Sequence, residues 1–177
     1  VLMPILLDFI KLMNEKYDDI TYIFHSTIDH SKLMQSFVKE SNLSNCEIVS
    51  DDKIKYYILQ KSVFAVAKSG TVSLEICNAK IPSIILYKMG FINFLIVKSL
   101  VKTKYANIIN FAANEEIIPE LLQSNCNSKN IFKYVDSFLD NPNKIKEQVE
   151  KVQIVLNKLK TKKSSSELAG LSLNKFL

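Results

Sequence analysis

The residues best suited to chemistry in this chain are Ser69, Gly70 and Thr71, followed four positions after the threonine by Glu75. The glycine lets the backbone approach a ligand closely, and free N–H groups at the start of a helix suit a phosphate. Glu75 would lie one turn up the same helical face as Thr71. A carboxylate placed there can accept hydrogen bonds from both hydroxyls of a vicinal diol, such as that of a ribose. The pattern therefore indicates a ligand that carries a phosphate and a sugar.

The same residues also have a structural interpretation, in which Ser69 or Thr71 only caps the helix. A capping box places Glu three residues after the cap, and neither hydroxyl residue has Glu at that spacing. The spacing alone leaves the ligand-binding and the structural interpretation about equally supported.

The motif lies between an apolar run at residues 63–67 and a helix-like run at residues 72–79. A strand that turns sharply into a helix brings the start of the helix to the ligand-binding edge of a parallel α/β sheet. Because strand-like and helix-like runs alternate, we expect about five parallel strands with residues 63–67 at the centre. The expected strands are residues 22–24, 47–49, 63–67, 83–87 and 106–109. The expected helices are residues 4–16, 31–39, 53–60, 71–79, 91–101 and 119–123, then one capped by Asn127 or Ser128 and a last one opened by Pro142.

The composition indicates one compact domain, residues 1–163, followed by a tail at residues 164–177. The chain has 177 residues, 47% of them hydrophobic, and a formal net charge of +5. Its basic residues are all lysine, so a phosphate must be held by backbone N–H groups, hydroxyls and lysine rather than by a guanidinium fork. Lysine is interleaved with Asp and Glu along the chain, which argues against a nucleic-acid partner.

The cysteines and the hydrophobic runs indicate a cytoplasmic protein. The three cysteines are far apart and lack metal-binding or redox spacing, so we interpret them as reduced thiols and expect no metal and no cofactor. The sequence contains no signal peptide pattern and no lysine-free apolar span of about 20 residues.

A more specific pattern begins at the motif and runs without insertions to residue 123. It consists of Ser69-Gly70-Thr71, Leu74-Glu75, Ala79-Lys80, Pro82, Tyr87, Phe94, Leu100-Val101-Lys102-Thr103, Tyr105, Asn110 and Glu120-Leu121-Leu122-Gln123. In order and spacing this set resembles the lipid-A-disaccharide synthases of bacteria. The likeness extends weakly in both directions over essentially the whole chain, which corresponds to the C-terminal half of such an enzyme.

The resemblance implies a glycosyltransferase of the two-Rossmann-domain B type. Such an enzyme transfers 2,3-diacylglucosamine from UDP to 2,3-diacylglucosamine 1-phosphate in lipid A biosynthesis, at the cytoplasmic face of the inner membrane. The chain would be the α/β donor-binding domain, a Rossmann-like parallel sheet flanked by helices. It would lack the first strand with its Gly-Ser-Arg phosphate turn and the whole N-terminal domain, to which the catalytic base would belong. We therefore expect no activity from the chain alone and assign no catalytic residue; a homodimer stays open.

The resemblance also implies roles for individual residues at the substrate site. Ser69, Gly70 and Thr71 would face the donor phosphates, and Glu75 would bind the uridine ribose. The other residues that it places at the substrates are Tyr87, Lys88, Asn110, Glu120 and Gln123. Structural roles stay open for these: Tyr87 as core packing, Asn110 as a turn residue after a strand, and Glu120 as a first-turn helix acid.

The sequence departs from the family pattern at several positions. Val63 stands where the family favours Asp, and Lys88 where it tends to have Arg. Ile109 replaces a Pro, and Asn114-Glu115 replaces a Gly-Arg pair. We therefore assign no acceptor-side contact to these positions from the resemblance alone, apart from Lys88.

Residues 91–101 form an apolar run with a narrow lysine-containing stripe, which suits an anionic membrane surface. The expected contacts are Phe91, Phe94, Leu95, Lys98 and Lys102. The alternative is a helix packed in the core or against the absent half.

Two other functions compete with the synthase interpretation. One is a non-catalytic remnant or membrane-associated α/β module. The other is a different UDP-sugar enzyme of the same fold, such as an epimerase.

Overall fold

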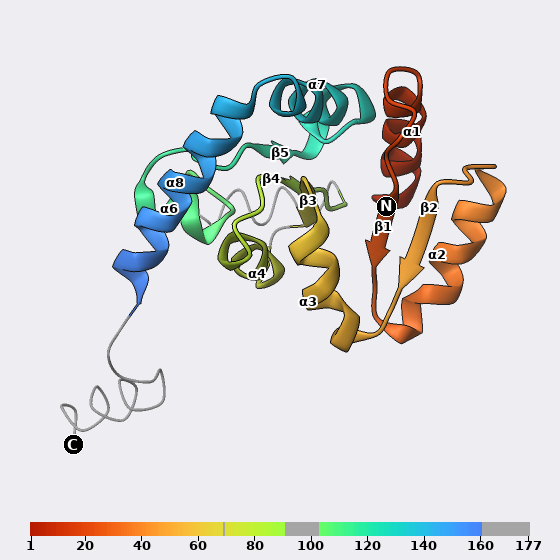
Figure 1. Ribbon diagram of the computed structural model, residues 1–177, viewed down its shortest axis with the longest axis horizontal. Coiled ribbons are helices and arrows are strands. Elements are labelled where there is room, and N and C mark those ends of the chain that lie inside the picture. The colour runs from red at the N-terminus through yellow and green to blue at the C-terminus, as the bar shows by residue number, and fades with distance from the viewer. Residues whose placement is uncertain (69, 91–102, 161–177) are drawn as a thin grey trace.

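The computed structural model describes residues 1–68, 70–90 and 103–160. These residues form an α/β domain in which parallel strands are flanked by helices (Figure 1). The expected α/β class is therefore confirmed. In chain order the elements are α1 Met3–Asn14, β1 Tyr22–His25, α2 Ile28–Glu40, β2 Cys46–Val49, α3 Asp52–Lys61, β3 Ala65–Lys68, α4 Val72–Asn78, β4 Ser83–Tyr87, α6 Ile108–Ala113, β5 Glu120–Leu122, the 3-10 helix η1 Gln123–Asn125, α7 Ser128–Leu139 and α8 Pro142–Leu159.

The five described strands are all parallel to their partners, but their hydrogen bonds divide them into two sheets. β1 pairs with β2, and the second sheet has the order β3-β4-β5. The expectation that residues 63–67 form the central strand is wrong, because β4 takes the centre of the three-stranded sheet and β3 lies at its edge. β4 has the longer apolar run, Ser83-Ile84-Ile85-Leu86-Tyr87, which suits a parallel strand buried on both faces.

Burial of β4 on both faces joins two hydrophobic cores. Ile84 and Leu86 are at most 1% exposed and pack into a core with Phe9 of α1 and Ile131 of α7. Ile85, also fully buried, points to the other face, where α4 and α8 cover the sheet. Figure 1 shows α1 and α7 side by side on one side of the strands, with α4 and α6 on the other. Because successive side chains of β4 point to opposite faces of the sheet, this one strand contacts the helices on both sides.

Most expected helices are confirmed, with ends shifted by one to three residues. α7 begins after Asn127, whose side chain accepts a hydrogen bond from the backbone N–H of Asn130. α8 has Pro142 in its first turn, and Asn141 caps it. The expected helix at residues 91–101 and the expected domain boundary at residue 163 both lie outside the described residues.

Two sequence expectations between residues 106 and 123 are wrong. Residues 106–109 do not form a strand, because the Asn107 side chain accepts a hydrogen bond from the backbone N–H of Ile109 and so starts α6. Residues 119–123 do not form a helix. Glu120–Leu122 instead pairs with β4, and the N–H of Ile85 donates to the carbonyl of Pro119 at 2.9 Å. Tertiary pairing here overrides the local helix signal of Pro119.

A polar network centred on Asn110 holds α6 against the start of β5. The Asn110 side chain is fully buried; its Oδ1 accepts hydrogen bonds from the backbone N–H groups of Ile117 and Ile118, both at 2.9 Å. Its Nδ2 donates to the Ile118 carbonyl at 2.6 Å and to a carboxylate oxygen of Glu120 at 2.8 Å. Glu120 also accepts from the N–H groups of Ala106 and Asn107. The Asn110 amide and the Glu120 carboxylate thus hold together residues 106–107, α6 and residues 117–120.

Replacement of this amide by a carboxylate should destabilise the fold. In Asn110→Asp, the Nδ2 donor becomes an oxygen that faces the Glu120 carboxylate and the Ile118 carbonyl, so two hydrogen bonds become repulsive contacts. We expect a loss of about 2–4 kcal/mol in the free energy of unfolding, measured by denaturant titration at neutral pH.

The matched control is Asn157→Asp, at an exposed position on α8. It should change the free energy of unfolding by less than about 0.5 kcal/mol. Equal stability of the two variants would show that the buried network contributes little.

Candidate functional site

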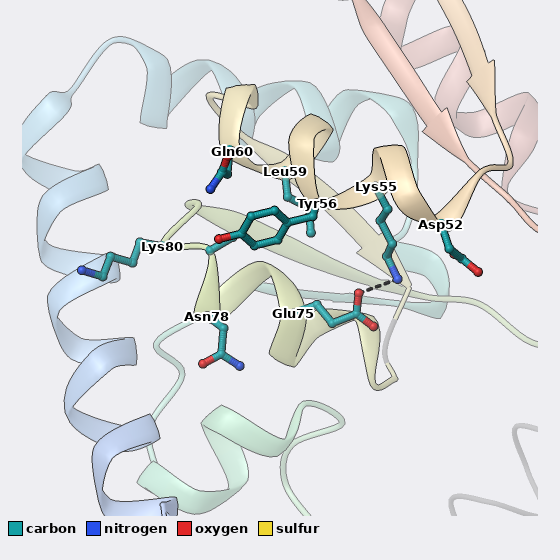
Figure 2. Close-up of a pocket in the computed structure, with 9 residues that line it drawn as sticks. Asp52, Lys55, Tyr56, Leu59, Gln60, Glu75, Asn78 and Lys80 are labelled. Atoms are coloured by element: carbon teal, nitrogen blue, oxygen red, sulfur yellow. Dashed lines mark ion pairs between the residues drawn. The ribbon is translucent and has the colours of Figure 1, made fainter.

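A cleft of about 590 Å³ opens between α3 and α4, the two helices that follow β2 and β3. Figure 2 shows side chains from both helices facing each other across it. Its lining combines carboxylates, ammonium groups, amides and one aromatic ring. The lining residues are Asp52, Lys55, Tyr56, Leu59, Gln60, Glu75, Asn78, Ala79 and Lys80.

Gly70 lies in the turn between β3 and α4, the helix that contributes Glu75 and Asn78 to the cleft lining. Its φ is +154°, a backbone conformation that residues with a side chain rarely adopt. A Cβ at this position would meet nothing within 4 Å, so the turn faces open space. The Gly70 carbonyl accepts hydrogen bonds from the Ser73 hydroxyl at 2.7 Å and from the Ser73 N–H at 3.2 Å. The requirement for glycine is therefore conformational, and it leaves the backbone accessible to a ligand.

The capping interpretation concerns two hydroxyl residues of the motif, Ser69 and Thr71. Thr71 takes the N-cap position of α4, but its side chain makes no capping hydrogen bond. The threonine hydroxyl is therefore not explained as a cap. Ser69 lies outside the described residues, and its predicted phosphate contact stays a prediction.

Glu75 lies one turn into α4 and forms an ion pair with Lys55, one turn into α3. The Glu75 side chain is 45% exposed and that of Lys55 is 22% exposed. A second acidic residue, Asp52, lies 3.5 Å from Nε2 of His25, at the end of β1. The cleft thus presents one carboxylate that is held by an ammonium group yet still reachable from solvent.

Sequence reasoning missed Lys55. The available signal was its position: Lys55 and Glu75 each lie one turn into a helix that leaves the carboxyl end of a parallel strand. Such helices start at the same edge of an α/β domain, and here the first turns of α3 and α4 meet through the ion pair of Lys55 with Glu75. The sequence separation of the two residues hides this relation.

Tyr87, Lys88 and Gln123 lie near the carboxyl ends of β4 and β5. Tyr87 is half-buried and ends β4, while the Lys88 ammonium donates to the carbonyl of Cys126 at 3.3 Å. Gln123 has a left-handed φ of +49°, and its Oε1 accepts from the N–H of Met89 at 3.1 Å. These bonds tie the ends of the two strands together.

The predicted site residues therefore fall into three groups. Gly70, Thr71 and Glu75 lie at or just before the beginning of α4, and of these Glu75 lines the cleft. Tyr87, Lys88 and Gln123 form the second group, described above. Asn110 and Glu120 form the third, where hydrogen bonds within the chain already use their polar side chains. Contacts of all three groups with a substrate stay predictions.

Two residues that depart from the family pattern, Asn114 and Glu115, have defined structural roles. Asn114 ends α6 with a left-handed φ of +52°, a conformation that glycine adopts freely and asparagine tolerates. Asn114 can therefore replace the expected glycine. The next residue, Glu115, pairs with Lys151 of α8 at 2.9 Å.

Metal and thiol chemistry find no support in the described part of the chain. The described residues contain no group of three or more His, Cys, Asp or Glu side chains that could hold a metal ion. Burial raises the pKa of the Cys77 thiol to about 11 and also raises the pKa values of Cys46 and Cys126. All three cysteines are free and, with raised pKa values, weak nucleophiles near neutral pH.

Comparison with known proteins gives one consistent result. The model of the lipid-A-disaccharide synthetase family matches residues 1–173. The lipid-A-disaccharide synthase of Rickettsia prowazekii is 35% identical over 158 residues, which cover 89% of this chain and 41% of that protein. The enzyme of the same name from a Sulfurihydrogenibium species is 32% identical over 178 residues, covering 96% of this chain and 46% of the relative.

The chain spans less than half the length of these relatives. The similarity extends well beyond the stretch that carries the motif, and it favours the synthase interpretation over an epimerase. On this evidence the chain belongs to the lipid-A-disaccharide synthetase family.

Proposed function

We propose that this chain is the donor-binding part of a lipid-A-disaccharide synthase. It binds UDP-2,3-diacylglucosamine, whose sugar is transferred to 2,3-diacylglucosamine 1-phosphate in lipid A biosynthesis. The observation that carries the proposal is the Gly70 turn. Its backbone faces open space just before α4, the helix whose half-exposed carboxylate, Glu75, lines the cleft.

Each part of a UDP group has a chemical counterpart at this position. The diphosphate would lie against the backbone and hydroxyls of the Ser69-Gly70-Thr71 motif, with lysine as the source of positive charge. The ribose diol would donate hydrogen bonds to Glu75, whose carboxylate offers several lone pairs. Tyr87 and Lys88, at the end of β4, would lie toward the sugar and the acceptor.

The chemistry of the transfer divides between this chain and the rest of the enzyme. Glycosyl transfer needs a general base for the acceptor hydroxyl and electrostatic stabilisation of the leaving UDP. The donor site supplies the second, because it holds the diphosphate on which negative charge develops. The base would come from outside this chain, so the chain alone would make no disaccharide.

Both substrates of the proposed reaction are lipids, so the enzyme would work at a membrane surface on the cytoplasmic side. None of the described helices is long and apolar enough to cross a bilayer. The membrane contacts expected from Phe91, Phe94, Leu95, Lys98 and Lys102 lie outside the described residues. Peripheral binding at the inner membrane stays part of the proposal.

A pair of glycine variants tests the position of the phosphate site. Gly70→Ala forces a side chain onto a residue with φ of +154°, so the turn must change shape. We expect its affinity for UDP, measured by calorimetric titration of the full chain, to fall at least about tenfold. Gly90→Ala also points its Cβ into open space but has no such φ, and it should bind UDP like the wild type. Equal binding by both variants would place the diphosphate elsewhere.

Removal of the carboxylate tests the ribose site. Glu75→Ala should weaken UDP binding by about 1–3 kcal/mol, because the ribose hydroxyls lose their acceptor. The same calorimetric titration measures the change, and denaturant unfolding confirms that the variant is folded. Unchanged affinity in a folded variant would assign Glu75 a structural role only.

A further inference from the structure

We propose that Lys55 is a positioning residue that holds the Glu75 carboxylate toward the ribose and so makes the cleft selective for ribonucleoside over 2′-deoxyribonucleoside diphosphates. This inference rests on the proposed function, since it requires the donor nucleotide to bind at Glu75. It concerns a residue that lies outside the motif, on another helix.

The two side chains meet across the cleft from different helices. Lys55 extends from α3, and its ammonium pairs with Oε2 of Glu75 on α4. Figure 2 shows this contact at one end of the cleft. Because the Lys55 side chain is only 22% exposed, its ammonium is partly shielded from water, which strengthens the interaction relative to a fully exposed pair.

No other lining residue does the same for Glu75. Lys80, the second lining cation, lies at the opposite end of the cleft in Figure 2. The second lining acid, Asp52, faces His25 instead. Within the described part of the cleft, Lys55 is therefore the group that can fix the direction of the Glu75 carboxylate.

The pair leaves room for a diol. An ionised carboxylate has about four acceptor positions on its two oxygens, and the ammonium contacts Oε2. Oε1 and the free side of Oε2 can still accept from the 2′- and 3′-hydroxyls. A Glu side chain that is already held loses less rotational freedom when the ribose binds, so its hydrogen bonds contribute more to affinity.

This role predicts an effect on selectivity rather than on stability. Loss of a partly exposed ion pair of this kind changes the equilibrium constant of unfolding by about fivefold or less, which corresponds to about 1 kcal/mol in free energy. Loss of a fixed acceptor weakens the hydrogen bond to the 2′-hydroxyl, which 2′-deoxy-UDP lacks. The ratio of the two dissociation constants therefore reports on positioning, whereas a general disturbance of the site changes both constants together.

The experiment titrates the full chain with UDP and with 2′-deoxy-UDP by calorimetry. We expect the wild type to prefer UDP by about tenfold, the value of one good hydrogen bond. Lys55→Met, which keeps the length of the side chain without its charge, should reduce this preference to roughly twofold or less, mainly through weaker UDP binding. Lys53→Met, at an exposed lysine on the same helix, should keep the wild-type ratio. Glu75→Gln should lose the preference, and addition of Lys55→Met to it should cause no further loss.

The outcomes separate this inference from the proposed function. A wild-type chain without saturable UDP binding overturns both. UDP binding with an unchanged preference in folded Lys55→Met overturns the role of Lys55 and leaves the donor site standing. If Lys55→Met loses affinity equally for UDP and 2′-deoxy-UDP, the positioning role is also overturned. Lys55 would then act as a counter-charge for the diphosphate.

Discussion

Burial of β4 on both faces is the constraint on which the rest of the domain depends. Ile84 and Leu86 point into the core under α1 and α7, and Ile85 points into the core under α4 and α8. β4 is parallel to both of its neighbours, as is typical of a strand covered on both faces; β3 pairs with residues 83–86 and β5 with residues 85–87. The carboxyl ends of β3, β4 and β5 then meet at one edge of the sheet. The Gly70 turn follows from this arrangement, since it is the first chain segment to leave that edge.

The polar residues of the family pattern divide between two tasks. Asn110, Glu120 and Gln123 hold backbone groups in the segments that leave or enter the sheet edge. Glu75 lines the cleft, and Gly70 lies in the turn before its helix with open space around it. A side chain of the first kind is costly to disturb when it satisfies several backbone groups, as Asn110 and Glu120 do. The family pattern therefore includes residues that stabilise the fold as well as residues that are free to contact a ligand.

Local signals in the sequence predicted most of the helices and β4. Asn127 and Pro142 marked the starts of α7 and α8, because caps and first-turn prolines act within a few residues. Of the two errors between residues 106 and 123, the first overlooked a local cap and the second concerns residues whose conformation depends on a distant partner. Residues 106–109 have strand-like side chains, yet Asn107 starts a helix there. Glu120–Leu122 forms a strand only because β4 is beside it.

The arrangement of the candidate site residues shows the same division between local and distant causes. The spacing of Gly70, Thr71 and Glu75 along one turn and one helix is local, so the sequence could show it. The ion pair of Glu75 with Lys55 joins two helices, and no pattern along the chain marks it. The burial of Asn110 likewise appears only once α6 is packed against β5.

The most direct test of a UDP site beside α4 is chemical-shift mapping of the ¹⁵N-labelled full chain during titration with UDP. The account predicts saturable shifts of the backbone amides of Gly70, Thr71 and Glu75, with smaller shifts at Lys55. Amides on the far side of the domain, such as that of Ser137 on α7, should stay in place. Absence of saturable shifts, or shifts confined to residues away from the Gly70 turn and the cleft, would contradict the account.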